Sequence, residues 1–436
     1  MLLKTSKLLR AIVILLAVAV TVNAQTKKSN AILIRAGKLY DSKKREFVKN
    51  QEILIQNGLI SEVGIKLFIP KGTTIIDLSQ HTLTPGLIDA HTHLLLSQKQ
   101  VKTGMEDASK KPVEERIKEG LQFAKQNLKA GITTVRDIGN SGQYLDVRLQ
   151  KILKTNKELG PDMYVSGPIL SPPGGQFSRL FPADSFVINQ EYRVIKGADD
   201  ARAAVLDHLV HGANVIKVCM NTDNRVLAPE EIKSIVLTAH ANKIPVTAHA
   251  TYDESARDAI LAGVDGIEHG YSLSDSTLTL MAERNVYLVP TDVSARQGRL
   301  LIAGIGMKGK EAEDYLTSNL KSSHDRLQRA VKKGVMIVSG SDFYNDIKDI
   351  ERGKGAVEVL MAYKEAGLAV VDVLRFATYN AAKALGLSAS IGDIKKGMRA
   401  NLVAFGGDLE QNFDQSLFDI KAVFHDGKLV FHTLEK

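Results

Sequence analysis

The stretch that decides the fold runs from 85 to 93 and reads Pro85-Gly-Leu-Ile-Asp-Ala-His-Thr-His93. Its apolar residues continue a run that begins at Leu83, which predicts a buried strand over 83–90. The strand ends at two histidines, His91 and His93. Side chains two apart on a strand point to the same side, so both imidazoles can reach one metal ion. Taken alone, a His-x-His pair is a weak motif that also occurs by coincidence in surface turns.

The region from Thr84 to about Leu387 alternates apolar strands with amphipathic helices. The predicted strands are 83–90, 133–138, 163–166, 215–220, 245–250, 266–269, 286–291 and 336–341, and helical patterns between them include 113–129, 200–211, 229–242 and 254–262. Eight such strands predict an α/β fold, a (β/α)8 TIM-type barrel over 84–390, with its active site at the C-terminal strand ends. Residues 293–325 do not follow the period and predict an inserted, mostly helical segment over the barrel mouth.

The two ends of the chain contain short strands and turns, in 25–83 and again in 391–436. Asn57-Gly58 separates two apolar runs, which is typical of a two-residue hairpin, and Asp426-Gly427 precedes the last run. Because both ends are β-rich and flank a different middle, they predict one small β-sandwich domain assembled from both termini.

Residues 1–24 have the pattern of a secretory signal peptide. A basic start is followed by the apolar run 11–20 and by Val22-Asn23-Ala24, which fits a cleavage site before Gln25. A single membrane anchor is the alternative, but the apolar run is far shorter than the roughly 20 residues that a spanning helix needs. The sequence therefore predicts an exported protein, periplasmic or secreted, without a stable membrane anchor.

Charge and cysteine content exclude some classes of protein. Removing 1–24 takes away three positive charges and lowers the formal net charge from +8 to +5. The chain has no basic run long enough to indicate nucleic acid binding. Cys219 is the sole cysteine, so no intrachain disulfide can form. It lies two residues after Lys217 and is interpreted as pocket lining without a redox role.

Four more polar residues lie at or near the predicted ends of other strands: Lys217, His249, His269 and Asp342. Each of these residues, taken alone, is more simply interpreted as a polar residue at a strand end whose hydrogen bonds are satisfied. Together with His91 and His93 they gather at one rim of one barrel, which predicts a metal site. Lys217 could be a Schiff-base nucleophile, an ion-pair partner, or a carbamate (N6-carboxylysine) that bridges two cations. The carbamate fits best, because a bare ammonium would repel the cations.

These residues, in this order, resemble the amidohydrolase superfamily in its two-metal subtype with a carboxylated lysine. The resemblance covers nearly the whole mature chain and includes a closing segment, 392–403, in which Asn401 departs from the Ala-Asp-Leu-Val of many relatives. Thr133-Thr-Val-Arg-Asp137 and Ile267-Glu-His-Gly270 most resemble the branch of prolidase-like and imidazolonepropionase-like enzymes.

The resemblance implies two divalent cations and a role for each residue of the cluster. One cation is held by His91, His93, Lys217 and Asp342, and the other by Lys217, His249 and His269. A hydroxide bridges them, and Asp342 carries its proton to the leaving amine. Histidine ligands favour zinc, while the carboxylate-type ligands would also tolerate manganese or cobalt.

Three residues are candidates for substrate binding. Gln176 stands in the loop 171–176, where many relatives have a histidine, and could donate a hydrogen bond to a carbonyl or carboxylate. Tyr252 could bind a substrate carboxylate, although a rim or core role is equally consistent. Arg136 could anchor an anionic group, but a structural ion pair with Asp137 or another neighbour is the favoured interpretation.

The preferred interpretation is a hydrolase that cleaves a C–N amide bond of a small molecule, with an Xaa-Pro-type dipeptide as the best guess. Cyclic amides, carbamates, N-acyl amino acids, ochratoxin-like amides, lactones and phosphotriesters remain alternatives within the same chemistry. A Schiff-base aldolase and a non-catalytic metal-binding barrel remain as other classes. Whether the chain forms a homo-oligomer is left open.

Overall fold

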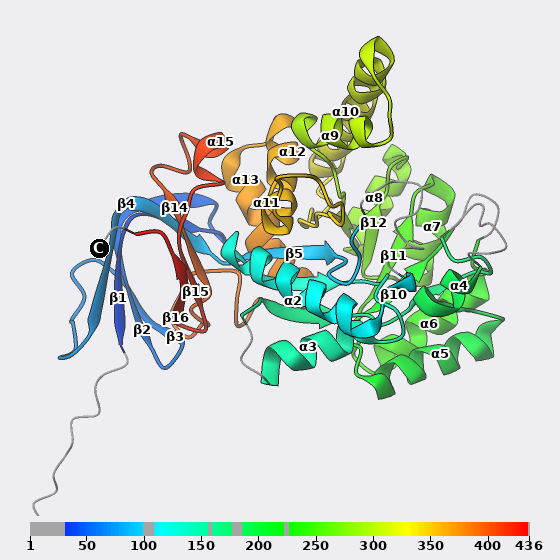
Figure 1. Cartoon of the computed structure of the whole chain (residues 1–436), viewed down its shortest axis with the longest axis horizontal. Helices are drawn as coiled ribbons and strands as arrows, with labels where there is room; N and C mark the ends of the chain where they lie inside the picture. Colours follow the sequence, from blue (N-terminus) through cyan, green and yellow to red (C-terminus); the bar gives the residue numbers. More distant parts are fainter. Residues whose placement is uncertain (1–30, 99–108, 156–158, 177–184, 222–225, 435–436) are drawn as a thin grey trace, which may run out of the picture.

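The computed structural model describes residues 31–98, 109–155, 159–176, 185–221 and 226–434. The predicted signal peptide over 1–24 lies outside the described residues. Within the described ranges, no helix combines the length and the apolar character that crossing a membrane would require. Figure 1 shows a strand-rich part at one end of the molecule and helix-covered strands at the other.

Both ends of the chain contribute to one seven-stranded sheet, ordered β16-β15-β14-β4-β1-β2-β3. Its strands are β1 (Ile32–Asp41), β2 (Glu46–Gln56), β3 (Leu59–Gly64), β4 (Thr74–Pro85), β14 (Leu402–Gly406), β15 (Ile420–His425) and β16 (Lys428–His432). Asn57 and Gly58 have positive φ between β2 and β3, as do Asp426 and Gly427 between β15 and β16, so both hairpin turns form as predicted. The strands from both termini thus share one continuous sheet. The structure does not show the predicted β-sandwich.

The middle of the chain forms two parallel sheets. The first contains β5 (Leu87–Thr92), β6 (Ile132–Asp137) and β7 (Asp162–Val165), and the second contains β13 (Tyr287–Val289), β12 (Gly266–His269), β11 (Val246–Ala250), β10 (Ile216–Cys219), β8 (Ile169–Ser171) and β9 (Tyr192–Val194), in that order. The predicted first strand, 83–90, is divided at Gly86, and its beginning belongs to β4 of the terminal sheet. A Cβ at Gly86 would lie 2.1 Å from Thr133 Oγ1, so only glycine permits this close passage.

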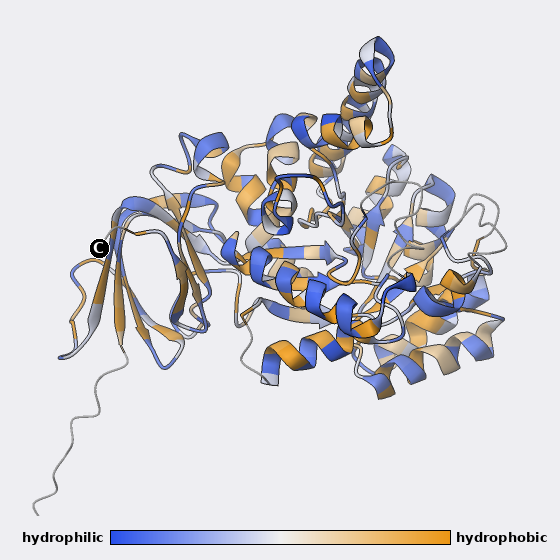
Figure 2. Cartoon of the chain, viewed as in Figure 1, coloured by the Kyte–Doolittle hydropathy of each residue, from blue (hydrophilic) through white to orange (hydrophobic). Residues whose placement is uncertain are grey.

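Helices surround the parallel strands. They are α2 (Val113–Lys129), α3 (Leu145–Thr155), α4 (Phe186–Glu191), α5 (Ala198–His211), α6 (Pro229–Ala241), α7 (Asp253–Ala262), α8 (Asp275–Arg284), α9 (Ala295–Gly304), α10 (Gly309–Lys332), α11 (Arg352–Val357), α12 (Val359–Glu365), α13 (Val370–Arg375), the π-helical turn η2 (Phe376–Asn380), α14 (Ala381–Ala384) and α15 (Phe413–Ser416). Figure 2 shows hydrophobic and hydrophilic stripes along α2, α3 and α5. The apolar stripes pack on the strands, and helix and strand residues together form the largest core cluster, which includes Val135, Ile216, Ala248 and Leu278.

The predicted eighth strand, 336–341, does not form a regular strand. Within this segment only Ile337 forms a β-bridge, to Leu288 of β13. The segment still connects its neighbours, because Val338 N donates to Leu288 O at 2.9 Å and Ala90 N of β5 donates to Ser339 O at 2.9 Å. It then passes so close to β5 that a Cβ at Gly340 would lie 2.7 Å from His91 Cβ. This tight approach and the turn that follows replace a regular strand.

The segment predicted as an insertion, 293–325, consists mainly of α9 and α10. Their far ends project from the body of the molecule in Figure 1. Helix α10 continues to Lys332, beyond the predicted limit, because its last turns bury Leu327 and Ala330 in the main core. One helix therefore serves both the projection and the layer around the strands.

The terminal sheet is tied to the parallel strands by a cluster of charges. Asp162, which begins β7, lies 2.7 Å from Arg399 Nη1 and 3.5 Å from His425 Nε2, and Arg399 Nη2 lies 2.6 Å from Asp426. These acids and this histidine are spaced as a metal site would be, but the Arg399 guanidinium already supplies the positive charge. Burial opposes ionisation of Asp162, and the hydrogen bonds from His425 and Arg399 outweigh it and lower its pKa.

Asp162→Asn is expected to destabilise the fold at neutral pH and to matter less in acid. The side chain of Asp162 is 30% exposed, so we expect a loss of about 1–2 kcal/mol in the free energy of unfolding. A folded-state pKa below the unfolded value of about 3.9 stabilises the fold above that pH, and this contribution disappears as the pH falls through the folded pKa. Urea unfolding of both proteins at pH 7 and near pH 3 measures the difference. A gap that stays constant or widens in acid would contradict this assignment.

Candidate metal centre

The six residues predicted from strand ends come together in the fold. His91 lies in β5, His93 directly after it, Lys217 in β10, His249 in β11, His269 at the end of β12, and Asp342 after the 336–341 segment. The imidazole rings form a continuous row: ring centroids are 5.2 Å apart for His93 and His91, 5.0 Å for His91 and His269, and 4.7 Å for His269 and His249.

Asp342 brings its carboxylate to this row. Its oxygens lie 3.2 Å from His93 Nε2, 3.6 Å from His91 Nε2 and 3.9 Å from His269 Nδ1. One ligand atom from each of His91, His269 and Asp342 falls within 4.8 Å of the others, a spacing at which one ion can contact all three. The Asp342 side chain is 21% exposed, whereas the histidines beside it are buried, so its carboxylate can reach a bound small molecule.

The charge states of three of the four histidines suit metal binding, whereas Asp342 outweighs burial and raises the pKa of His93. Burial, with the charge of Lys217, lowers the pKa of His249 to about 3 and that of His91 well below its ordinary value. Burial and the neighbouring histidines do the same for His269. Neutral imidazoles are the form that binds metals. For Asp342, the interactions with His91 and His93 overcome burial and lower the pKa, so the carboxylate is ionised at neutral pH.

Lys217 has an amine without a partner. The side chain is 1% exposed, and its Nζ makes no hydrogen bond to any described residue. Burial lowers its pKa to about 8, against the pull of the carboxylates of Glu268 and Asp342. A buried ammonium without a partner is costly, because it has lost its hydration. The Lys217 amine therefore requires a group that neutralises or binds it, and the described residues do not supply one.

Glu268 holds one histidine of the row in place. The sequence did not lead to its prediction as a site residue. It is fully buried and accepts a hydrogen bond from His91 Nδ1 at 2.6 Å, which leaves His91 Nε2 directed at Asp342. It also pairs with Arg136 and accepts from Thr247. A carboxylate that orients a histidine in this way is typical of metal sites. The signal was present in Ile267-Glu-His-Gly270, as a charged residue next to a strand-end histidine.

The structure shows Arg136 in a structural ion pair with a neighbour, the favoured interpretation, and does not support its weaker role as a substrate anchor. Its guanidinium is buried and donates to Glu268, to Tyr287 Oη at 2.6 Å and to Ala90 O at 2.6 Å. Every one of these partners is structural. Its ion-pair partner is Glu268 from another strand, and Asp137 instead accepts from Leu94 N at 2.6 Å. Arg136 therefore stabilises the carboxylate that orients His91.

The other histidines are oriented by neighbours that only the fold reveals. His93 Nδ1 donates to Gly139 O at 2.8 Å, and His269 Nδ1 lies 2.8 Å from Thr291 Oγ1. His269, Thr291 and Asp342 all have positive φ, between 49° and 69°. For a β-branched threonine this is a strained conformation, costing about 1–3 kcal/mol, and such residues concentrate at functional sites.

Asp89 connects the two segments that end in His91 and Asp342. Its carboxylate accepts from Ser341 Oγ at 2.6 Å, from Ser341 N at 2.9 Å and from His91 N at 3.1 Å. Burial raises its pKa to about 6, although these hydrogen bonds oppose the shift. The sequence contained this residue in the first quoted stretch, but its partner Ser341 lies 252 residues away.

The two remaining substrate candidates lie at the edge of the cluster. Gln176 places Nε2 3.0 Å from His249 Nδ1, and its Oε1 accepts from Tyr192 Oη at 2.9 Å. It is thus in contact with the histidine row. Tyr252 precedes α7 and is 48% exposed, which gives it the rim position that was the alternative to substrate binding. Cys219 is buried and donates to Asn221 O at 3.2 Å.

Comparison with known proteins shows what the whole chain is similar to. The chain is 28% identical over 439 residues to an ochratoxinase of Aspergillus niger, covering 94% of this chain and 86% of that protein. It is 21% identical to an imidazolonepropionase of Fusobacterium nucleatum, covering 93% and 99%. A solved Xaa-Pro dipeptidase with methionine bound in its active site is 25% identical, with a TM-score of 0.77 over 92% of this chain and 100% of that chain.

The α/β fold with parallel sheets is consistent with the TIM-barrel type of these neighbours. The sequence model of the amidohydrolase family matches residues 82–430, which include the whole histidine row, Lys217 and Asp342. We conclude that the chain belongs to the amidohydrolase family.

Proposed function

We propose that this hydrolase cleaves a C–N amide bond of a small molecule and that an Xaa-Pro-type dipeptide is the best candidate substrate. The reaction would use two divalent cations, and the histidine ligands favour zinc. The amidohydrolase family generally uses divalent metals, and the His and Asp groups for one are present. The observation that carries the proposal is the unpartnered, buried Lys217 amine among four histidines and Asp342.

The proposed ligands divide into two sets that share Lys217. His91, His93, Lys217 and Asp342 would hold one cation, and Lys217, His249 and His269 the other. When bound, the cations supply a Lewis acid that polarises the scissile carbonyl and lowers the pKa of water from about 15.7 towards about 7. Glu268, Gly139 and Thr291 keep the imidazoles oriented for this role.

Lys217 would serve as N6-carboxylysine. A pKa of about 8 leaves part of the amine neutral near pH 7, and this form attacks carbon dioxide. The new N–C bond would form as the nitrogen releases a proton to solvent, and the product would be a carbamate anion. In place of an ammonium that repels cations, Lys217 would then offer carboxylate-type oxygens as ligands. The missing partner of Nζ supports this assignment.

Asp342 would carry the proton. Its low pKa keeps it ionised, so it can accept a proton from the attacking water. Its partial exposure lets the same oxygen deliver that proton to the nitrogen of the leaving amine. Cleavage of the C–N bond then yields a carboxylic acid and an amine.

Asp342→Asn is expected to lower kcat by about 10²- to 10⁴-fold, because an amide cannot accept and return the proton. Metal content should remain measurable, since the histidines stay in place. Steady-state kinetics and metal analysis of the same preparation test both statements. Normal turnover in Asp342→Asn would remove the proton-transfer role.

The known relatives support an amide derived from an amino acid. One solved relative is an Xaa-Pro dipeptidase with bound methionine, and another, also 25% identical, is a prolidase complexed with N-methylphosphonate-L-proline. The ochratoxinase and imidazolonepropionase relatives favour a second candidate, an N-acyl amino acid or a cyclic amide. Gln176 stands at the histidine row, where it could hydrogen-bond a carbonyl of either class.

A screen of the purified, metal-assayed protein tests the proposal. Xaa-Pro dipeptides and N-acyl amino acids are offered, and release of the amine is measured. About two zinc equivalents together with amine release would support the site and the reaction. Two metals without amine release would overturn the amide proposal and direct the search to lactones. Failure to bind metal, even with bicarbonate present, would overturn the site itself.

A further inference from the structure

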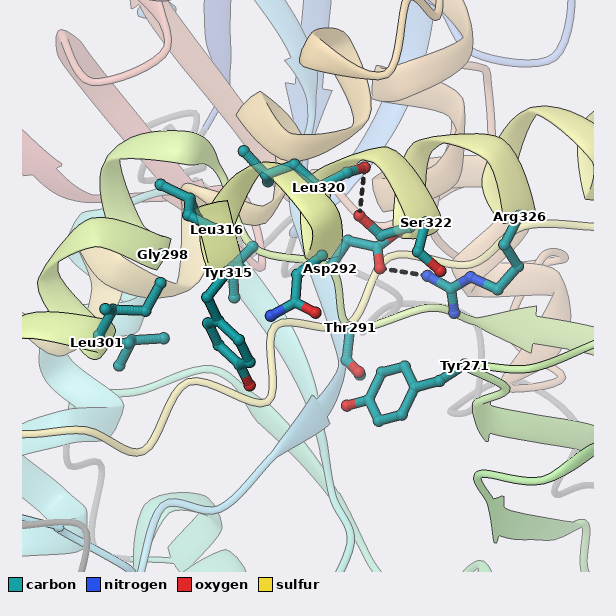
Figure 3. Close-up of a pocket in the computed structure, with 14 residues that line it drawn as sticks. Tyr271, Thr291, Asp292, Gly298, Leu301, Tyr315, Leu316, Leu320, Ser322 and Arg326 are labelled. Atoms are coloured by element: carbon teal, nitrogen blue, oxygen red, sulfur yellow. Dashed lines mark hydrogen bonds and ion pairs between the residues drawn. The ribbon is translucent and has the colours of Figure 1, made fainter. Parts of the chain in front are cut away.

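An apolar cavity lies beside the histidine row, between the strand ends and the projecting helices. Its volume is about 470 Å³, within the range of pockets that hold small organic ligands. Most of its wall comes from α9 and α10, as Figure 3 shows, and its apolar part consists of Val293, Leu301, Ile302, Tyr315, Leu316 and Leu320. Gly298 permits the close packing of the two helices, since a Cβ there would lie 2.6 Å from Leu316 Cδ1.

The cavity adjoins the candidate metal centre, because two of its lining residues contact His269. Thr291 Oγ1 lies 2.8 Å from His269 Nδ1, and Tyr271 Oη lies 3.3 Å from the same atom. The Tyr271 ring also lies beside the His269 ring in a tilted arrangement, with centroids 5.4 Å apart. The cavity is thus separated from the histidine row by no more than the residues Thr291 and Tyr271, which contact both.

The charges in the cavity wall cancel. Arg326 and Asp292 are both buried and pair with each other, and Arg326 also donates to His269 O. Figure 3 shows this pair at the side of the cavity, opposite the leucines of α9 and α10. Because the two charges cancel, the wall offers no net charge to compensate a charged group for its lost hydration. An apolar group is instead stabilised by burying its surface against each leucine and tyrosine that it contacts.

We propose that this cavity binds a bulky apolar side chain of the substrate, next to the scissile amide. This inference rests on the proposed function and narrows it: the substrate is a dipeptide or N-acyl amino acid with an aliphatic or aromatic residue, in preference to glycine or a charged residue. The helices α9 and α10 therefore select the substrate, and the histidine row performs the reaction on it.

Ser322→Trp tests the cavity. Ser322 lines it from an exposed position on α10, so an indole can fill the space without disturbing the core. Ser318→Trp is the matched control, an exposed serine one turn earlier on the same helix and outside the lining. Each protein is assayed on Xaa-Pro and N-acetyl-Xaa substrates in which Xaa is glycine, leucine, phenylalanine or aspartate. The readout is the ratio of kcat/KM between the leucine or phenylalanine substrate and the glycine one, which does not depend on the fraction of active enzyme.

The wild-type protein and Ser318→Trp are expected to prefer leucine or phenylalanine by about 10- to 100-fold, and Ser322→Trp should lose about 10-fold of that ratio. A wild-type enzyme without this preference, or an unchanged ratio in Ser322→Trp, would overturn the inference. Binding of 4-fluoro-L-phenylalanine, followed by fluorine NMR, separates this result from failure of the proposed function. Binding that is lost only in Ser322→Trp would support the cavity even if no amide were cleaved, and absence of binding to the wild type would count against it.

Discussion

Lys217→Ala is expected to lose both metal ions and all measurable activity together. Lys217 belongs to both proposed ligand sets, so its removal affects each cation. The alanine would also leave an empty space in a position that is now buried, next to four histidines that cannot bridge the cations by themselves. Metal analysis and steady-state assays of the reconstituted protein measure the two losses on one preparation.

Short carboxylic acids should restore part of the activity of Lys217→Ala. The space left by the lysine side chain can hold acetate or propionate, whose carboxylate replaces the oxygens of the carbamate. Cys219→Ala is the matched control, because Cys219 lies in the same strand, is equally buried, and is assigned only to the pocket lining. It should keep its metal. A Lys217→Ala protein that retains two metal equivalents would contradict the bridging role, and an intermediate trapped by borohydride in the wild type would favour a Schiff base instead.

Glu268→Gln is expected to have the second largest effect, on stability and on metal affinity. The substitution removes the charge that compensates Arg136 in a fully buried pair. Breaking a buried ion pair on one side costs about 3–5 kcal/mol of unfolding free energy. Loss of the carboxylate that orients His91 should in addition weaken metal binding by about 10- to 100-fold. Chemical denaturation of the metal-free protein and competition titration with a chelator measure the two effects separately.

Glu358→Gln separates the effect of breaking a buried ion pair from the effect of losing the carboxylate that orients His91. Glu358 is also buried and pairs with Arg296, with a further hydrogen bond from Ser294, and none of these residues touches the histidine row. This variant should lose stability and keep the metal affinity of the wild type. If Glu268→Gln behaved in the same way, Glu268 would be a structural residue only.

The residues that meet in the candidate metal centre could be located from the sequence because their signal is local. A strand shows itself by a short apolar run, and the residue at its end is read directly from the chain, as for His249 and His269. Parallel strands place their carboxyl ends at one edge, so four histidines, Lys217 and Asp342 were expected to meet. The two hairpin turns were equally local, since Asn57-Gly58 and Asp426-Gly427 adopt positive φ almost independently of the rest.

Partners across the fold could not be predicted in this way. Arg136 was expected to pair with a neighbour or a substrate, and its partner Glu268 is 132 residues away. Ser341 and Asp89 meet across 252 residues. Such contacts depend on which strands lie side by side and on the rotamers that packing allows, and neither is encoded in the period of the sequence.

The sequence by itself determined the family and indicated most of the strands and helices, and it placed six candidate metal ligands at or near strand ends, because each of these depends on residue type and local spacing. Only the tertiary structure decided that both termini share one continuous sheet, that the 336–341 segment is irregular beside His91, and that α9 and α10 enclose an apolar cavity next to His269. The physical reason is that these features arise from close approach between distant segments, where excluded volume and buried charge are balanced in three dimensions.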